Sequence, residues 1–373
     1  MGNHQFKSLF GQKSAIAALR RALDADCLPG CYLLTGATGV GKGAVALALA
    51  QAAACLRPVR DPFDSCGECE SCRRSSSDTN PELKQFFPAG DYTQIGQFWE
   101  RDGKSDSGIL SRTLQFAPVI GKKRVYIVDR AESLTEAAAN SLLKVLEEPP
   151  SYALFILLSP GTSRVLPTIV SRSQVVRLTA SPRADLARYL NEELSIEWAR
   201  SELLAAFSEG RTGQAVRMAM TPTVGQEIAA VMDFAVTIPG APPVRALRLA
   251  EQLRKLSGQL KALVGDDRPP ESGEDSESVS SSKEKSTRRQ VAAALDVMVL
   301  FYRDLVACSA GGRARETVIN RDRAESIMTI ARTDQPSRWV SSLDAILIAR
   351  RRLDANASIP LLTETLCMAL VRT

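Results

Sequence analysis

The chain has 373 residues, of which 45% are hydrophobic and 24% are charged, and its formal net charge at neutral pH is +5. A chain of this length forms two or three domains rather than one core, and its charge is too nearly balanced to indicate a nucleic-acid partner. The one histidine, His4, lies near the N-terminus, which excludes Ser/His/Asp triads, Cys/His dyads and histidine-ligated metal sites.

The N-terminal sequence, MGNHQFKSLFGQ, has no basic segment followed by an apolar stretch, so it does not predict a secretory signal. No apolar run in the chain reaches the roughly 18 residues that a membrane-spanning helix needs. We therefore expect a cytoplasmic protein without a membrane partner.

Short apolar runs rich in strand-forming residues alternate with helical stretches in the first half of the chain. This pattern is typical of βαβ units, in which helices pack on a parallel sheet. We expect strands at CYLLT (31–35), RVYIVD (124–129) and ALFILLS (153–159), and helices at 42–55 and 136–147, the second helix with Thr135 as its N-cap.

A glycine-rich loop, GATGVGKG (36–43), directly follows the first strand and leads into a helix. Strand, loop and helix in this order are the context of a phosphate-binding loop, in which backbone N–H groups and the helix N-terminus face the phosphates. The alternative is an ordinary glycine-rich turn. The nucleotide that this loop would hold is ATP with Mg²⁺, and the expected binding residues are Gly36, Gly39, Gly41, Lys42, Gly43 and, at the end of the strand 124–129, the carboxylate Asp129.

Cysteines cluster after this helix, at positions 55, 66, 69 and 72. The C-x2-C spacings suit tetrahedral zinc–thiolate geometry, and in a cytoplasmic chain they favour metal binding over disulfides. Four thiolates fill the coordination shell of Zn²⁺, so we expect a structural zinc site rather than a catalytic one. Free thiols are the alternative. The expected ligands are Cys55, Cys66, Cys69 and Cys72.

The stretch AAANSLLKVLEEPP (137–150) resembles, almost residue for residue, the AAANALLKxLEEPP signature of bacterial clamp-loader subunits in the AAA+ ATPase superfamily. A plain amphipathic helix stopped by two prolines would explain the leucines. It would not explain the polar residues in this order, which are Asn140, Lys144, Glu147 and Glu148. The resemblance is close from about residue 7 to residue 178 and looser beyond.

At three positions, this chain carries a different residue from the family members that hydrolyse ATP. Gly43 replaces the Ser or Thr whose hydroxyl binds Mg²⁺, and Arg130 replaces the glutamate that polarises the attacking water. Gly213 falls where those members carry a sensor arginine, which is similar to the delta-prime pattern. We therefore expect weak or absent ATP hydrolysis. The residues that offer substitutes are Glu132 for the glutamate, and Arg211 or Arg217 for the arginine.

The segment LPTIVSRS (166–173) resembles the family's Ser-Arg-Cys motif, with Ser173 in the place of the cysteine. In that family the arginine reaches the ATP of a neighbouring subunit and stabilises charge on the transferred phosphoryl group. The resemblance makes Arg172 a candidate arginine finger acting in trans. Without the family, Arg172 would be taken for a solvated surface residue.

The resemblance implies an α/β RecA-like AAA+ domain with a parallel sheet, followed by two α-helical domains. It also implies a four-cysteine zinc module in the first domain, at 55–72. Beyond residue 181 helix-forming residues dominate, with a proline-rich break at 239–243. The expected domains are the AAA+ domain at 1–180, a helical lid at 181–222 and a helical collar at 223–373.

Within the expected collar, residues 265–289 are polar, serine-rich and almost free of apolar side chains, so we expect a disordered insertion. A regulated docking segment is the alternative. The sequence RRRLDANASIPLLTE (350–364) resembles the end of the clamp-loader collar, although an amphipathic helix pair with a basic face explains it equally well.

The resemblance therefore implies a delta-prime-like subunit of the bacterial replicative clamp loader, largely non-catalytic, that offers Arg172 to a neighbour. The implied partners are the other subunits of a hetero-pentameric loader, the sliding clamp, and primer-template DNA contacted through the assembled complex. The alternative is the loader's ATP-hydrolysing motor subunit, with Lys42, Asp129 and Glu132 active.

Overall fold

The computed structural model describes residues 4–88, 92–99, 108–264, 276–311 and 318–372, except for the side chains of 276–283 and 372. The chain divides into two compact units. The first contains Met1–Ser181 and Arg211–Gln214, and the second contains Pro182–Gly210 and Ala215–Thr373. The finer division into lid and collar stays a prediction.

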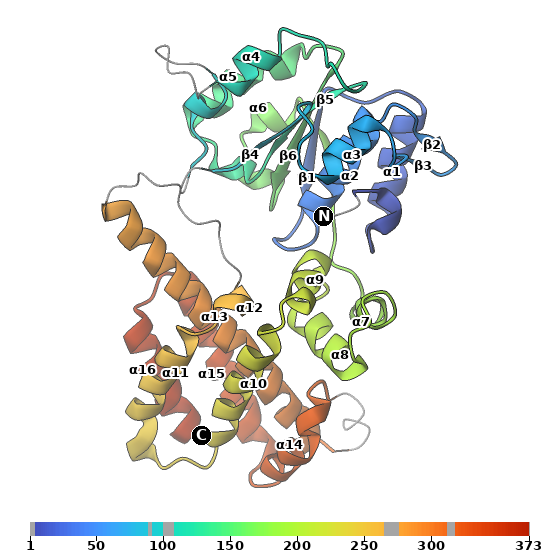
Figure 1. Ribbon diagram of the computed structural model, residues 1–373. Helices are drawn as coiled ribbons and strands as arrows, with labels where there is room; N and C mark the ends of the chain where they lie inside the picture. The colour runs from blue at the N-terminus through green and yellow to red at the C-terminus, as the bar shows by residue number, and fades with distance from the viewer. Residues whose placement is uncertain (1–3, 89–91, 100–107, 265–275, 312–317, 373) are drawn as a thin grey trace. The chain divides into compact units, whose positions relative to one another are not determined.

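The first unit is built on a five-stranded sheet, in which every strand runs parallel to its neighbours (Figure 1). Buried, mostly apolar runs form its three central strands, as expected where helices cover both faces of a parallel sheet. The expected α/β fold class is confirmed. In spatial order the strands are β4 (Leu83–Phe86), β5 (Arg124–Val128), β6 (Ala153–Ser159), β1 (Cys31–Thr35) and β7 (Gln174–Arg177).

Successive residues of the central strands enter two different apolar cores, because side chains alternate across a strand. One core packs against α1 (Lys13–Asp24) and α2 (Lys42–Ala54), and the other against α5 (Glu136–Glu147) and α6 (Pro167–Val170). The strand residues of the first core include Tyr32, Leu34, Val125, Ile127, Leu154 and Ile156, and those of the second include Leu33, Tyr126, Val128, Phe155 and Leu157.

The strands and helices expected from the sequence agree with those observed to within one residue. The expected N-cap is also present, because the hydroxyl of Thr135 accepts a hydrogen bond from the backbone N of Ala138 at 3.3 Å. The remaining elements of this unit are α3 (Glu70–Ser76), α4 (Ile109–Thr113), β2 (Val59–Arg60), β3 (Phe63–Asp64), η1 (Phe6–Ser8), η2 (Ile95–Gln97), η3 (Ala131–Ser133) and η4 (Thr162–Arg164).

A buried ion pair fixes the loop that precedes β5. Arg124 donates from Nε to Glu82 Oε2 at 2.6 Å, and the two side chains are only 7% and 1% exposed. The same arginine donates to the carbonyl oxygen of Phe116 at 2.8 Å, while Glu82 accepts from the backbone N of Val119 at 2.6 Å. The two charged side chains therefore pair with each other and with backbone groups of the loop at 116–119, which they keep in place.

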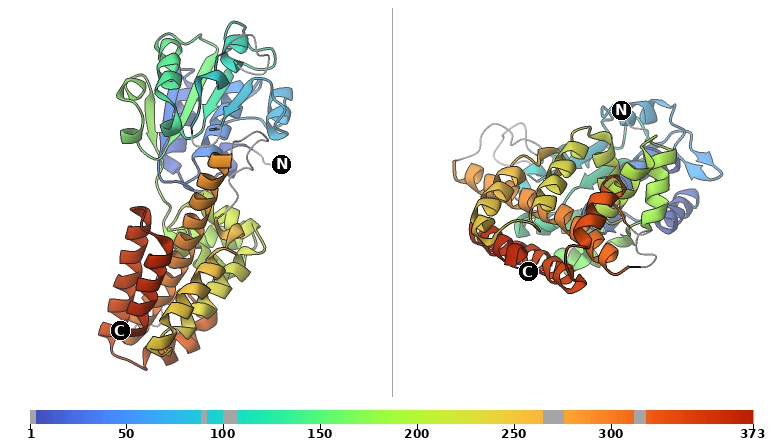
Figure 2. Two further views of the ribbon diagram at one scale, coloured as in Figure 1. Left: turned by 90° about the vertical axis from the view of Figure 1, so that its left-hand side faces the viewer. Right: turned by 90° about the horizontal axis from the view of Figure 1, so that it is seen from below.

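The second unit is helical in the part that the structure describes. Its longest helices, α13 (Ser276–Ser309) and α15 (Pro336–Asp354), run side by side, and α16 (Ile359–Arg372) packs on α15 (Figure 2). Across the described ranges, no helix combines the length and the apolar character needed to cross a bilayer. Its other helices are α7 (Arg183–Glu192), α8 (Trp198–Phe207), most of α9 (Thr212–Met220), α10 (Val224–Thr237), η5 (Pro243–Arg245), α11 (Ala246–Ser257), α12 (Lys261–Val264), η7 (Arg321–Arg323) and α14 (Ala324–Ala331).

The expectation of a disordered insertion at 265–289 is wrong for residues 276–289, which form the first part of α13. Residues 265–275 lie outside the described residues. No glycine or proline interrupts the sequence between Ser276 and Ser309, so a helix anchored by its buried second half can extend through polar residues. Arg288 further ties this stretch to the unit by donating to the carbonyl oxygen of Ala357 at 2.9 Å.

Candidate functional site

The glycine-rich loop forms the turn between β1 and α2. Three of its four expected glycines have positive φ values, which are 150° at Gly36, 85° at Gly39 and 105° at Gly41, conformations that side chains rarely adopt. The backbone N of Gly36 donates to the carbonyl oxygen of Ser159 at 3.2 Å, which ties the loop to the end of β6. The sequence folds this way because only glycine tolerates this succession of angles.

The N–H groups of this loop are available to an anion. Over the described residues, no group accepts a hydrogen bond from the backbone N–H of Gly39, Gly41, Lys42 or Gly43. Such orphan donors at a helix N-terminus suit phosphate. A Cβ added at Gly43 would meet nothing within 4 Å, so the backbone leaves space for the start of a side chain there. The loop therefore fits phosphate but offers Mg²⁺ no hydroxyl ligand at this position.

Lys42 folds back onto its own loop. Its Nζ donates to the carbonyl oxygen of Gly36 at 2.7 Å and to that of Ala37 at 3.2 Å. Burial lowers the pKa of Lys42, while the charges of Glu132 and, less strongly, Asp129 raise it. The lysine therefore lies in the field of two carboxylates that follow β5.

The segment after β5 carries Asp129, the carboxylate that we expected at the end of this strand, followed by a tight turn. The backbone N of Asp129 donates to the carbonyl oxygen of Phe86 at 2.9 Å, at the end of the strand. Arg130 adopts a left-handed conformation, with φ 49°, and begins η3. Glu132 in η3 has a buried carboxylate oxygen, Oε2, that makes no hydrogen bond in the described structure. Its electrostatic effect on Lys42 was not foreseen from the sequence, because only the folded turn brings their charges together.

The segment 211–214 lies against the phosphate loop. The backbone N of Gln214 donates to the carbonyl oxygen of Gly39 at 3.0 Å. A Cβ added at Gly213 would lie 3.0 Å from the same oxygen and 3.3 Å from the backbone N of Gly41. Both distances are shorter than ordinary Cβ contacts, so a larger residue at 213 requires the segment or the loop to shift by a few tenths of an ångström. The resemblance led us to expect a sensor arginine at the position of Gly213, but nothing in the sequence predicted this contact.

Arg172 lies near the end of the sheet at which β1 begins, whereas the phosphate loop lies at the opposite end, where β1 stops. The next residue, Ser173, contacts the thiol of Cys31 with its hydroxyl at 3.2 Å, and Cys31 is the first residue of β1. The phosphate loop follows Thr35, the last residue of β1. Four residue steps of about 3.3 Å separate the two ends of this strand. Arg172 itself pairs with Glu147, the last residue of α5, at 2.7 Å.

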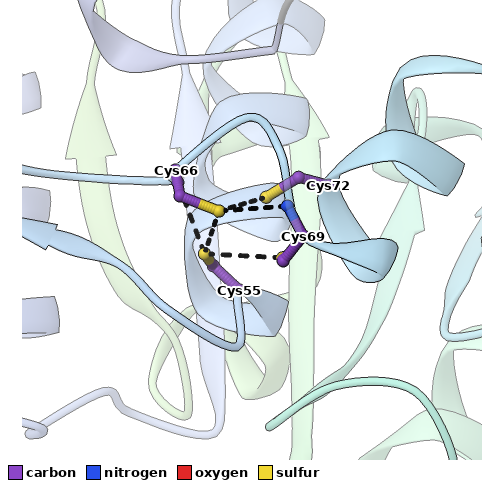
Figure 3. A group of neighbouring side chains, drawn as sticks. All are labelled: Cys55, Cys66, Cys69 and Cys72. Carbon is purple, nitrogen blue, oxygen red and sulfur yellow. Dashed lines mark hydrogen bonds between the residues drawn. The ribbon is translucent and has the colours of Figure 1, made fainter.

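The four predicted cysteine ligands converge on one point (Figure 3). Cys55 follows α2, Cys66 follows β3, and Cys69 and Cys72 come from the start of α3. The sulfur of Cys55 lies 3.6 Å from that of Cys66 and 3.9 Å from that of Cys69, and the sulfurs of Cys66 and Cys72 are 3.9 Å apart. All four sulfur atoms lie within 4.8 Å of one another.

These distances fit zinc. Sulfurs at the corners of a tetrahedron around Zn²⁺, with Zn–S bonds of about 2.3 Å, are about 3.8 Å apart. The backbone N of Cys66 donates to the sulfur of Cys55 at 3.4 Å, and that of Cys69 to the sulfur of Cys66 at 3.3 Å, which favours thiolates. The thiol of Cys72, with smaller contributions from backbone N–H groups, lowers the pKa of Cys55 to about 5. The donor set therefore fits a structural zinc ion.

Comparison with known sequences finds similarity to subunits of DNA polymerase III. The sequence pattern of the family described as DNA polymerase III, delta subunit, matches residues 11–182. The DNA polymerase III subunit delta' of Bacillus subtilis is 27% identical over 361 residues, which are 96% of this chain and 96% of that protein. The DNA polymerase III subunit tau/gamma of Haemophilus influenzae is 31% identical over 192 residues, 52% of this chain but only 26% of that longer protein.

Among solved structures, a DNA polymerase III gamma subunit-related protein from Thermotoga maritima aligns with 90% of this chain and 98% of its own, at 15% sequence identity and a TM-score of 0.38.

Proposed function

Because this chain belongs to the bacterial DNA polymerase III clamp-loader subunits, with the delta-prime subunit as a relative along nearly its whole length, we propose that it is a largely non-catalytic loader subunit. In this proposal it assembles with the other subunits of a hetero-pentameric loader and offers Arg172 to the ATP of a neighbour. The loader places the sliding clamp on primed DNA, and any contact with DNA is to phosphates and is weakened by salt.

The observation that carries the proposal is the separation of Arg172 from the chain's own phosphate loop. The contact of Ser173 with Cys31 lies at the start of β1, whereas the loop begins after Thr35 at its end. An arginine at the opposite edge of the sheet is unsuited to the chain's own nucleotide. Its position supports action on a nucleotide that another subunit holds.

Weak hydrolysis is supported by what surrounds the loop. Gly43 supplies no hydroxyl for Mg²⁺, and Arg130 supplies no carboxylate and stands in a left-handed turn. The backbone at Gly213 lies in contact with the phosphate loop, at the position where we expect the family's motor subunits to carry an arginine. Nucleotide bound here would serve to hold the fold or the assembly rather than to drive it.

The cysteine cluster is proposed to hold structural Zn²⁺. When bound, the ion would cross-link the end of α2 to the start of α3 through Cys55 and the pair Cys69 and Cys72. This module leaves no open coordination position for a substrate.

The proposal is tested by nucleotide binding and steady-state ATP hydrolysis of the isolated, zinc-replete chain. We expect negligible turnover, and we expect the double variant Gly43→Thr with Arg130→Glu to gain Mg²⁺-dependent affinity, because a side chain at 43 meets open space. Turnover of about 1 s⁻¹ or more by the unmodified chain, abolished by Lys42→Ala, would overturn the proposal.

Turnover by the unmodified chain would instead support the alternative function, that of the ATP-hydrolysing motor subunit. The observation in its favour is Glu132, whose buried and unbonded carboxylate oxygen follows Asp129 closely and whose charge acts on Lys42. Glu132→Gln distinguishes the two functions, because it abolishes turnover only if this carboxylate serves hydrolysis.

A further inference from the structure

An ion pair joins the two sequence motifs that flank β6. The Nη2 atom of Arg172 donates to Oε1 of Glu147 at 2.7 Å. The Nη1 atom donates to the carbonyl oxygen of Thr168 at 3.1 Å and lies 3.5 Å from the hydroxyl of Ser171. The guanidinium is therefore fixed from two sides, by the end of α5 and by α6.

Some N–H donors of the same arginine have no acceptor among the described residues. A guanidinium has five N–H donors, and the contacts named above occupy only those on Nη1 and one on Nη2. Within the described ranges, nothing accepts from the Nε–H of Arg172 or from the second N–H of its Nη2. The arginine side chain is 35% exposed and that of Glu147 is 52% exposed. An approaching anion therefore finds two free donors on a guanidinium that is already held.

We propose that Glu147 is a positioning residue for Arg172 and holds its free donors toward the phosphates of the neighbouring subunit's ATP. This inference rests on the proposed trans role of Arg172. A free arginine side chain samples many rotamers, and that freedom is lost when it binds a phosphate. The pair with Glu147 removes much of this freedom before the subunits meet, so the arginine acts from a preorganised position.

Two properties of the pair separate this role from a role in folding. Both side chains are partly solvated, and exposed ion pairs add little to stability. The next residue, Glu148, is also an exposed glutamate but makes no ion pair within the described residues. Glu148→Gln therefore removes the same charge, one position away, without releasing Arg172.

The test uses the complete loader, reconstituted with this chain and its partner subunits, and measures single-turnover ATP hydrolysis. The Arg172→Ala loader identifies the ATP site on which this chain acts, because hydrolysis at that site is slowed. We expect Glu147→Gln to slow this hydrolysis about tenfold, with the half-saturating concentration of ATP unchanged. This loss is a part of the roughly 10³-fold that removal of an arginine finger costs. We expect Glu147→Asp to recover most of the rate and Glu148→Gln to match the unmodified loader.

A double variant completes the test. If Glu147 acts through Arg172, Glu147→Gln adds no further loss to Arg172→Ala. Four results overturn the inference while leaving the proposed function intact: an unchanged rate with Glu147→Gln, a faster rate, an equal loss with Glu148→Gln, or additive losses in the double variant. An Arg172→Ala loader with unchanged hydrolysis overturns the proposed function itself, and the inference with it.

Discussion

The backbone N of Gln214 donates to the carbonyl oxygen of Gly39 at 3.0 Å, so the first turn of α9 is hydrogen-bonded to the phosphate loop. The neighbouring Gly213 makes this possible, because any side chain there would press on the backbone of Gly39 and Gly41. The position at which the resemblance led us to expect a sensor arginine in motor subunits is in this chain a point of backbone contact.

Substitution of Gly213 by alanine tests this contact. Alanine normally stabilises a helix relative to glycine by as much as about 1 kcal/mol. Here the added Cβ would lie 3.0 Å from Gly39 O, and we expect Gly213→Ala to lower the free energy of unfolding by about 1–3 kcal/mol. Urea denaturation measures the difference.

Gly43 provides the matched control, because it is also the second residue of a helix and a Cβ there meets nothing within 4 Å. We expect Gly43→Ala to be neutral or to stabilise. Equal stabilisation by both alanines would show that Gly213 is not under steric restraint.

The cysteine cluster predicts about one zinc ion per chain, measured by metal analysis of the purified protein. We expect Cys66→Ser to lose most of this zinc and to lower the free energy of unfolding by more than about 2 kcal/mol, because metal binding contributes directly to folding. Cys27→Ser is the control, since Cys27 is exposed and lies outside the cluster. Full zinc content in Cys66→Ser would remove this cysteine from the ligand set.

The buried pair of Arg124 and Glu82 predicts a large effect on stability. Glu82→Gln leaves the guanidinium buried without its counter-charge, and we expect a loss of about 3–5 kcal/mol in the free energy of unfolding at pH 7. Glu148→Gln is the control, because Glu148 is exposed and we expect it to change stability by less than about 0.5 kcal/mol.

The same pair predicts a pH dependence. Burial alone would raise the pKa of Glu82, but the hydrogen bond from Arg124 and those from backbone N–H groups outweigh burial, so the pKa is lowered. A lowered pKa in the folded state stabilises the protein above the unfolded pKa of about 4.3, and this contribution is lost as the pH falls below it. The stability difference between the unmodified chain and Glu82→Gln should therefore shrink below about pH 4. A difference that is constant from pH 7 to pH 3 would exclude this linkage.

The fold of the first unit follows closely from the sequence, because the strands at 31–35, 124–129 and 153–159 are continuous apolar runs and the helix at 136–147 has both a cap and a stop. The start of α13 could not be predicted in the same way. Its residues 276–289 are almost all polar, so the sequence offers no apolar periodicity that would indicate a helix. They are helical because they continue a helix whose later residues, such as Phe301 and Leu305, are fully buried.

The candidate site was predictable where spacing carries the chemistry, as in the four cysteines and the glycine-rich loop. The contacts that join distant segments were not. Glu147 and Arg172 are 25 residues apart and pair only because α5 and α6 pack together, and Gln214 reaches Gly39 across a much longer stretch of chain. Such partners depend on tertiary structure, and neither residue type nor spacing indicates them.

We propose that this chain contributes to ATP hydrolysis through Arg172 and not through its own phosphate loop. The most direct test compares ATP hydrolysis by loaders reconstituted with the Lys42→Ala chain and with the Arg172→Ala chain. We predict that Lys42→Ala leaves the rate unchanged, whereas Arg172→Ala slows hydrolysis at the neighbouring site by about 10³-fold. The opposite result, a loss with Lys42→Ala and none with Arg172→Ala, would contradict the account and make this chain a motor subunit.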